Sequence, residues 1–257
     1  MPDVVLPVHE AATLPWVFSR MPRGSGNDRS RGDSAEIASG RGSSKVTRSS
    51  TVAVICKQPI AGRVKTRLTP PLSPGRAAAV AQAALRDTLA TVATVECDRR
   101  VAVLDGQPGA WLPSGFDVLV QRGQGLDERL GAAFADLGPG PTLLIGMDTP
   151  QVTRQLLERA LVCLQAGETV IGPTSDGGYW AIGLTGGGPE HFRGVPMSTA
   201  RTFACQRDRL ERRGLRPVVM QTLTDVDDIA SALAVAAIAP RTRFTQAMAE
   251  CRALELV

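Results

Sequence analysis

The sequence predicts an α/β protein built on a mostly parallel sheet, and three observations carry this prediction. Apolar runs rich in β-branched residues, such as residues 52–56 and 142–145, are typical of strands buried on both faces of a parallel sheet. Longer segments with apolar residues at helical spacing alternate with these runs. Loops rich in Gly and charged residues follow several of the runs, at the positions where open α/β sheets bind their ligands.

The elements are expected in a regular order along the chain. Ser73 before Pro74 starts a helix, because Ser caps a helix N-terminus and Pro suits the first helical position. Strands are expected at residues 52–56, 99–104, 116–120, 142–145, 169–171, 179–184 and 216–223. One helix is expected from about residue 74 to 95, a second ends at residue 137, and a third runs from 153 to 165. A fourth helix ends near residue 213, a fifth begins after residue 228, and a sixth runs from 242 to 254.

The composition limits the function classes. The chain has 257 residues with 43% hydrophobic residues, and its net charge of +4 is too small to argue for nucleic-acid binding. The cysteines are far apart without metal-like spacing, so free thiols in a reducing cytoplasm are expected. No apolar run approaches the roughly 20 residues that span a bilayer. We expect a cytoplasmic protein with a small-molecule substrate, no nucleic acid and no membrane span, and leave a homodimer open.

The N-terminal segment differs from the rest of the chain. Residues 20–50 are rich in Arg, Ser, Gly and Asp and offer little apolar surface, so a disordered extension over 1–50 is expected. One domain then occupies residues 51–257. A basic arm for nucleic acid is an alternative, although acidic residues dilute its charge. A translation start further downstream, for instance at Met21, is another.

A cationic loop follows the first strand and is the predicted phosphate site. Gly62 allows the backbone to approach a ligand closely, and Lys and Arg side chains suit phosphate oxygens. The spacing is not that of a Walker loop, and a solvated basic loop is the alternative. The expected phosphate-binding residues are Lys57, Gly62, Arg63, Lys65, Thr66 and Arg67. A second Gly-rich turn, with Gln124 and Gly125 before a helix, is expected to bind the nucleotide, or else simply to cap that helix.

Carboxylates follow two of the predicted strands and suggest a cation. Asp148 comes directly after residues 142–145, and Asp225 and Asp227 follow the last strand. A hard divalent ion prefers one or two carboxylates together with substrate phosphates. Asp148 as a helix cap is the alternative. Asp176 opens a third loop, and Tyr179 begins an alternating strand after it. Tyr179 and Trp180 form an aromatic pair, which is either part of the core or a platform for a sugar or base.

Five motifs in order over residues 51–239 resemble those of the DUF2064 family of GT-A-fold proteins, which are provisionally assigned as glycosyltransferases. The motifs are Lys-Gln-Pro-x-x-Gly-x-Val-Lys-Thr-Arg-Leu, Gly-Met-Asp-Thr-Pro, Gly-Pro-x-x-Asp-Gly-Gly-Tyr-Trp-x-Ile-Gly-Leu, Phe-x-Gly-Val-Pro-Met-Ser-Thr and Asp-Val-Asp. The resemblance implies a single GT-A or Rossmann-like nucleotide-diphospho-sugar transferase fold that binds a nucleotide with Mg²⁺ or Mn²⁺. MobA-like nucleotidyltransferases share the architecture, and 2-phospholactate guanylyltransferases resemble the first and last motifs.

The resemblance also assigns expected roles to positions in this sequence. Lys57, Lys65 and Arg67 match the phosphate-contacting loop. Asp148 matches the metal aspartate, although it stands alone where many such enzymes have Asp-x-Asp, and Asp227 matches the second carboxylate. Asp225 is taken as a further metal ligand. The expected substrate-binding residues are Asp176, Gly177, Gly178, Tyr179, Ser198 and Thr199.

The preferred hypothesis is a nucleotide-dependent transferase, specifically a glycosyltransferase with a nucleotide-sugar donor and a divalent metal. Its expected catalytic residues are Asp148, Asp176 and Lys65. The runner-up is a nucleotidyltransferase that transfers a nucleoside monophosphate from an NTP to a small anionic substrate. A non-catalytic nucleotide sensor or scaffold is a third hypothesis, which the joint presence of the cationic loop and the carboxylates disfavours. A nucleic-acid binder acting through residues 1–50 is the fourth.

Overall fold

The computed structural model describes residues 49–253 of the chain. The predicted disordered extension, residues 1–50, therefore lies almost entirely outside the described residues. Within them the chain forms a seven-stranded sheet of order β3-β2-β1-β4-β6-β5-β7. All neighbouring strands are parallel except β6, which runs antiparallel to both β4 and β5. The mixed, mostly parallel α/β architecture is the one that the sequence predicted.

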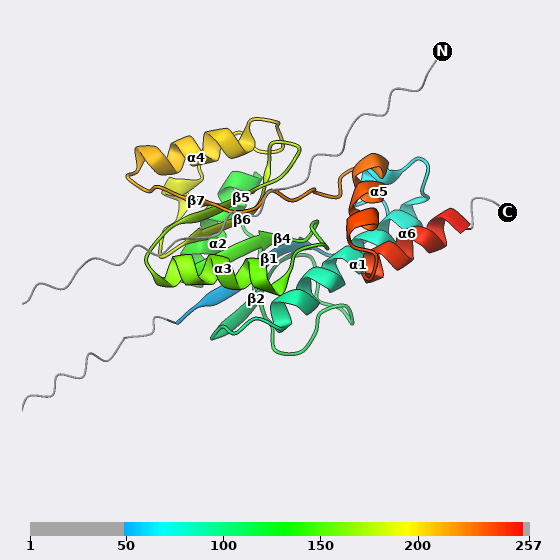
Figure 1. Cartoon of the computed structure of the whole chain (residues 1–257), viewed down its shortest axis with the longest axis horizontal. Helices are drawn as coiled ribbons and strands as arrows, with labels where there is room; N and C mark the ends of the chain where they lie inside the picture. The colour runs from blue at the N-terminus through cyan, green and yellow to red at the C-terminus, as the bar shows by residue number, and fades with distance from the viewer. Residues whose placement is uncertain (1–48, 254–257) are drawn as a thin grey trace, which may run out of the picture. The chain divides into compact units, whose positions relative to one another are not determined.

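The strands and helices alternate along the chain (Figure 1). The strands are β1 (Thr51–Lys57), β2 (Arg99–Asp105), β3 (Asp117–Val120), β4 (Thr142–Gly146), β5 (Val170–Pro173), β6 (Tyr179–Leu184) and β7 (Val218–Val219). The α-helices are α1 (Pro74–Ala93), α2 (Leu126–Leu137), α3 (Arg154–Gln165), α4 (Thr202–Arg212), α5 (Ile229–Ile238) and α6 (Arg243–Ala253).

Helices cover both faces of the sheet, so the central strands are apolar on both sides. On one face, residues of α1 and α3 such as Leu89 and Leu157 pack against Val54 of β1. On the other face, residues of α2 and α4 pack against Ala53 of β1, together with Phe192. This explains why the strand over residues 52–56 lacks a polar face: a sheet covered on both sides buries consecutive residues.

A third apolar cluster fixes the C-terminal helices to the start of α1. It contains Leu68 from the loop after β1, Val80 of α1, Val235 of α5 and Phe244 of α6. Figure 1 shows α5 and α6 beside α1, at one end of the sheet. Because Leu68 belongs to the cationic loop, this cluster anchors the C-terminal end of that loop.

Local capping accounts for the helix starts. Ser73 accepts a hydrogen bond from the backbone N–H of Arg76, with Pro74 at the first helical position, as predicted. Thr153 caps α3 in the same way. Asp228 and Ser231 form a reciprocal capping box at the start of α5. The predicted helices are thus found, with ends shifted by a few residues.

The prediction of a long last strand over residues 216–223 was wrong, because β7 is only Val218–Val219. Pro217 has no N–H to donate to a ladder. Beyond β7 the chain still follows β5, through the bond from Leu223 N to the Pro173 carbonyl, 3.1 Å long. The Trp180 indole also donates to the Gln221 carbonyl, at 3.0 Å. These isolated contacts guide the segment to the sheet edge without making it a strand.

The topology brings several loops to one edge of the sheet. Strands β1, β4, β5 and β7 all point their carboxyl ends to this edge, and antiparallel β6 starts there. Parallel α/β sheets bind ligands at this edge, next to the point where the strand order changes direction. Among residues 49–253, none of the helices is long and apolar enough to cross a membrane.

Candidate active site

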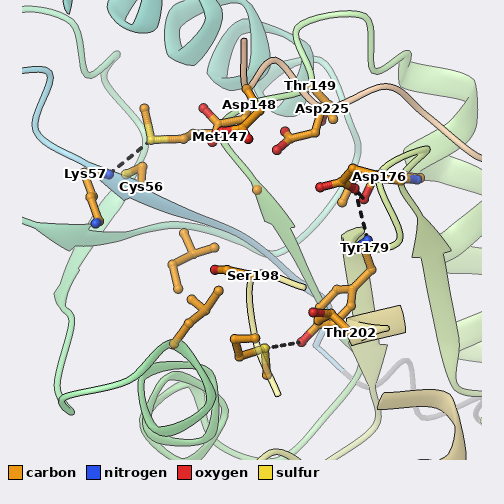
Figure 2. A pocket seen from close by; sticks show the side chains of 18 of the residues that line it. Cys56, Lys57, Met147, Asp148, Thr149, Asp176, Tyr179, Ser198, Thr202 and Asp225 are labelled. Atoms are coloured by element: carbon orange, nitrogen blue, oxygen red, sulfur yellow. Dashed lines mark hydrogen bonds between the residues drawn. The ribbon is translucent and has the colours of Figure 1, made fainter. Parts of the chain in front are cut away.

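A cavity of about 810 Å³ lies at this edge and collects most of the predicted site residues. Figure 2 shows part of its lining, with Lys57 at one end of the view and Asp176 and Tyr179 at the other. Gly62, Gly125 and Gly177 are predicted site residues that do not line it. The predicted residues that do are Lys57, Arg63, Lys65, Thr66, Arg67, Gln124, Asp148, Asp176, Gly178, Tyr179, Ser198, Thr199, Asp225 and Asp227.

Lys65 joins the cationic loop to the carboxylates. Its Nζ lies 2.8 Å from Oδ1 of Asp148, its side chain is only 8% exposed, and it also donates to the Val226 carbonyl. Burial on its own would lower the pKa of Lys65, but the carboxylates of Asp148 and Asp225 outweigh it and raise that pKa above its usual value. Its backbone is left-handed, with a φ of 48°, which is uncommon for a residue other than Gly. Lys65 is therefore a charged internal partner of the carboxylates in this structure.

A second ion pair ties the same two loops together on the outside. Arg67 pairs with Asp227, and the two side chains are 71% and 43% exposed. Exposed ion pairs contribute only about 0–1 kcal/mol, because solvent screens them. The pair is thus weak enough to open when a stronger anion competes for the Arg67 guanidinium.

The carboxylates are crowded around Asp225. Burial first, and then repulsion by the Asp148 carboxylate, raises the pKa of Asp225 to about 7, with Lys65 opposing the shift. Asp176 and Asp227 add smaller repulsive contributions to it. Figure 2 shows Asp148, Thr149 and Asp225 close together, with Asp176 next to them. The cluster has more negative charge than its one buried lysine compensates.

Two buried oxygens beside this cluster lack hydrogen bonds. Oδ1 of Asp148 contacts Lys65 as an ion pair but makes no hydrogen bond of good geometry. Oγ1 of Thr149, a residue that is 1% exposed, has no hydrogen-bond partner within residues 49–253. A buried polar group without a partner costs about 1–3 kcal/mol. Both atoms belong to residues that line the cavity, in which a ligand could satisfy them.

The donor set fits a cation that shares its ligands with a bound phosphate. Among the described residues, no group of three or more His, Cys, Asp and Glu side chains could hold a metal ion without further ligands. The Asp148 carboxylate acts electrostatically on Asp225, whereas Asp227 is paired with Arg67. Of the two predicted partners of Asp148, Asp225 is therefore the one that has no ion pair of its own among the described residues. Phosphate oxygens and water would complete an octahedral shell.

Two cations at the opposite end of the cavity have no ion-pair partner among the described residues. Lys57 and Arg63 make no ion pair with any residue that the structure describes. Both act electrostatically on Asp105 at the end of β2, where Arg129 lies 2.8 Å from that carboxylate and lowers its pKa. Gln124 lines this end, and its N–H donates to Glu128. Gly125 is the N-cap residue of α2.

Sequence reasoning missed Gln121 and Arg129, which line this end as well. The Gln121 side chain donates to the carbonyls of Cys56 and Val103, at 2.8 and 2.9 Å, and its Oε1 accepts from Arg129. Gln121 therefore holds β1, β2 and α2 together below the cavity. The signal was its place directly after a strand, but a single Gln at a strand end is too common to stand out.

Asp176 is held in a tight turn at the other end. Its Oδ1 accepts hydrogen bonds from Thr174 Oγ1 at 2.5 Å and from Gly178 N at 3.0 Å. Gly177 has a φ of 90°, and a Cβ there would lie 2.1 Å from the Ala200 carbonyl oxygen. Only Gly fits this position, so the Asp-Gly-Gly motif serves to pack this turn against the loop before α4. Gly177 is thus structural and Asp176 faces the cavity.

Tyr179 and Trp180 both line the cavity, but Trp180 is mainly a core residue. Trp180 is 2% exposed and packs in the hydrophobic core. Tyr179 lines the cavity, and its hydroxyl lies 3.3 Å from Oε1 of the buried Gln206. Ser198 has a left-handed backbone with a φ of 57° and lines the cavity beside Thr199. Thr202, another lining residue that sequence reasoning missed, donates to the Pro196 carbonyl.

This fold, with its site at the carboxyl edge, is the nucleotide-diphospho-sugar transferase fold. The model of the family described as "Uncharacterized protein conserved in bacteria (DUF2064)" matches residues 79–199. The resemblance indicated by the sequence motifs is therefore confirmed over that segment. No curated protein matches the chain.

Several solved structures are similar to this chain to different degrees. One is a protein of Desulfovibrio desulfuricans G20, described provisionally as a nucleotide-diphospho-sugar transferase, with 25% identity and a TM-score of 0.73 over 80% of this chain and 96% of that one. The manganese complex of Rv0371c from Mycobacterium tuberculosis H37Rv has 21% identity and a TM-score of 0.44, over 74% and 98%. A cytidylyltransferase for 2-C-methyl-D-erythritol 4-phosphate from Thermus thermophilus has 16% identity and a TM-score of 0.46, over 75% and 98%.

Proposed function

We propose that this protein is a nucleotide-dependent transferase whose catalytic domain occupies residues 51–257. The observation that carries the proposal is the arrangement of charges in one cavity: unpaired cations at one end and crowded carboxylates at the other. A nucleoside diphosphate group needs cationic side chains, and its bound cation needs carboxylates. A scaffold protein needs neither. The protein from Desulfovibrio desulfuricans, with its provisional transferase description, supports the same class.

Within this class we prefer glycosyl transfer from a nucleotide sugar. Lys57 and Arg63 would bind the diphosphate, because they have no acidic partner among residues 49–253. Asp148 and Asp225 would hold a divalent cation, either Mg²⁺ or Mn²⁺. When bound, such a cation neutralises the charge that develops on a leaving diphosphate. Cys56, Cys97, Cys163 and Cys205 are free thiols, which agrees with a reducing cytoplasm, where we place the protein.

Lys65 and Arg67 would then have different roles toward the diphosphate. Arg67 can leave the exposed Asp227 pair at low cost and contact a phosphate oxygen. Lys65 is buried and remains with Asp148, so its role is to hold that carboxylate in place and to limit the repulsion inside the cluster. This assigns Lys65 to positioning and Arg67 to ligand binding, where the motif comparison had assigned both to phosphate.

Asp176 is the side chain best placed to receive the second substrate. Its Oδ1 is occupied by Thr174 and Gly178, which leaves the other carboxylate oxygen for a substrate hydroxyl. A carboxylate within hydrogen-bond reach of an attacking hydroxyl can act as general base. The rigid turn around Gly177 keeps the carboxylate in one orientation.

The test is a thermal-shift screen followed by product analysis. A ligand that binds only the native state raises the apparent stability, so the screen covers nucleoside diphosphates, triphosphates and nucleotide sugars, each with and without Mn²⁺. A donor that binds is then incubated with acceptors, and the released product is identified. A nucleoside diphosphate indicates glycosyl transfer, while pyrophosphate indicates the nucleotidyltransferase alternative. A screen in which no nucleotide shifts the melting temperature contradicts the proposal.

A further inference from the structure

We infer that the second substrate is a neutral molecule bearing hydroxyl groups, and that the cavity discriminates against phosphorylated or carboxylated acceptors. This inference rests on the proposed function and narrows it to a substrate class. It is drawn from the distribution of charge over the cavity lining. The strand order β3-β2-β1-β4-β6-β5-β7 puts the loops of β1 to β3 on one side of Asp148 and those of β5 to β7 on the other.

The cations of the lining come from the first side only. They lie at the end of β1, in the loop after it and on α2, and they are Lys57, Arg63, Lys65, Arg67 and Arg129. Of these, Lys57 and Arg63 lie near Asp105 at the end of β2, on whose carboxylate both act. Lys65 stays with its buried partner Asp148, whereas Arg67 can leave the exposed Asp227 pair. A diphosphate bound to this side would use the remaining positive charge.

The second side has hydrogen-bonding groups but no positive charge. Its lining comes from the β5–β6 turn and the loop before α4, and it includes no Lys, Arg or His among residues 49–253. Its polar members are Thr174, Asp176, Tyr179, Ser198, Thr199 and Thr202. Figure 2 shows Asp176, Tyr179, Thr202 and Ser198 on this side of the cavity, away from Lys57. Hydroxyls and a carboxylate are partners for the hydroxyl groups of a polyol or sugar.

An anionic acceptor would meet repulsion on this side. The Asp176 carboxylate lines this side, and no Lys, Arg or His of the described residues lines it. A phosphate or carboxylate placed here would add a further negative charge without a cation to pair with it. Like charges brought together at an interface suppress binding. The geometry therefore disfavours the anionic acceptor that the nucleotidyltransferase alternative requires.

The experiment compares neutral acceptors with related anionic acceptors. Full-length protein is given a donor that binds in the nucleotide screen, with Mn²⁺ present. Acceptors are supplied in pairs: glucose with glucose 6-phosphate, glycerol with glycerol 3-phosphate, and glucose with gluconate. The acceptor-dependent release of nucleotide or pyrophosphate is measured, and the product is identified by mass spectrometry. We expect the neutral member to be preferred by about tenfold or more.

A charge variant supplies the positive control. Ala200 lines the second side, is exposed, and has no side-chain polar role. Ala200→Lys adds a cation there and should shift the preference toward the phosphorylated member by about tenfold. Ala93→Lys adds the same charge at the exposed end of α1, outside the cavity, and should leave the preference unchanged. The melting temperatures of both variants check that they fold. The comparison of neutral and anionic acceptors in the wild type does not depend on either variant.

The outcomes separate this inference from the function on which it rests. A neutral preference in the wild type supports the inference. Equal or better use of the anionic members, or no use of any neutral member by a protein that binds the donor, overturns it while nucleotide-dependent transfer remains. If no nucleotide binds in the screen, the proposed function fails, and the inference fails with it.

Discussion

The Lys65 ammonium lies 2.8 Å from the Asp148 carboxylate, and this contact joins the loop after β1 to the residue after β4. The lysine side chain is almost fully buried, at 8% exposure, while the Asp148 side chain is 32% exposed. Removing one partner of a buried pair leaves an uncompensated charge, which typically costs about 3–5 kcal/mol. The contact therefore determines both the stability of the cavity and the position of its carboxylates.

The first prediction compares two lysines of the same loop. Lys65→Met should lower the free energy of unfolding by about 3 kcal/mol, because Asp148 and Asp225 lose their buried cation. Lys57→Met should change it by less than about 0.5 kcal/mol, because Lys57 is exposed and has no ion pair among the described residues. Urea unfolding without metal measures both. Equal stability of the two variants would mean that Lys65 is not the partner of the cluster.

The second prediction concerns Arg67. Arg67→Ala should leave stability within about 1 kcal/mol, because its pair with Asp227 is exposed. It should weaken nucleoside diphosphate binding by roughly ten- to a hundredfold, since losing a hydrogen bond to a charged group costs about 1.5–3 kcal/mol. Isothermal titration calorimetry with Mn²⁺ measures the affinity. Unchanged affinity would remove Arg67 from the diphosphate site.

The third prediction is a pH dependence of stability that originates at Asp225. Its pKa rises from the usual 3.8 to about 7 on folding, so between these values the native state binds the extra proton. Stability contributed by this group is therefore present at low pH and lost as pH rises toward 7. Asp225→Asn removes the titration. In metal-free buffer, the melting temperature of the variant should be higher than that of the wild type at pH 8 and equal to it at pH 4.

The control for this prediction is a carboxylate outside the cavity. Asp136 pairs with Arg122 on the surface, and Asp136→Asn should show no gain in melting temperature between pH 4 and pH 8. If the stability difference between the wild type and Asp225→Asn is the same at pH 8 as at pH 4, burial and the neighbouring carboxylates do not raise the pKa of Asp225.

The fourth prediction concerns two glycines with similar backbone angles. Gly177→Ala should destabilise the protein strongly, because the new Cβ would lie 2.1 Å from the Ala200 carbonyl oxygen. Gly62→Ala meets no atom within 4 Å, so only the left-handed backbone opposes it, at about 1–2 kcal/mol. Chemical unfolding of both variants measures the difference. Similar losses would show that the turn at Gly177 can move away from α4.

Local patterns were enough to predict most of the fold. Residues 52–56 and 142–145 form β1 and β4 as expected, because a continuous apolar run suits a strand covered on both faces. The last strand could not be placed, since its boundaries depend on isolated bonds such as that from Trp180 to Gln221. Such contacts join residues far apart in the sequence, where no periodic pattern reveals them.

The sequence predicted which residues belong to the candidate site, but not which of them pair with each other. The position of Asp148 after a strand and of Asp225 and Asp227 after another placed all three at one sheet edge. Which of them face each other depends on where Lys65 and Arg67 reach, and both side chains could equally have pointed at a ligand. Gln121 was missed because its role consists of hydrogen bonds to the backbone of other strands.

The most direct test of the account is the cation dependence of nucleoside diphosphate binding in Asp148→Asn. The substitution keeps the size of the side chain and removes the charge that would hold the cation. Calorimetry is carried out with and without Mn²⁺ on the wild type, on Asp148→Asn and on Asp136→Asn as the surface control. The account predicts that Mn²⁺ strengthens binding to the wild type and to Asp136→Asn, and that Asp148→Asn loses this gain. The same gain in all three proteins would contradict a cation shared between the carboxylates and the diphosphate.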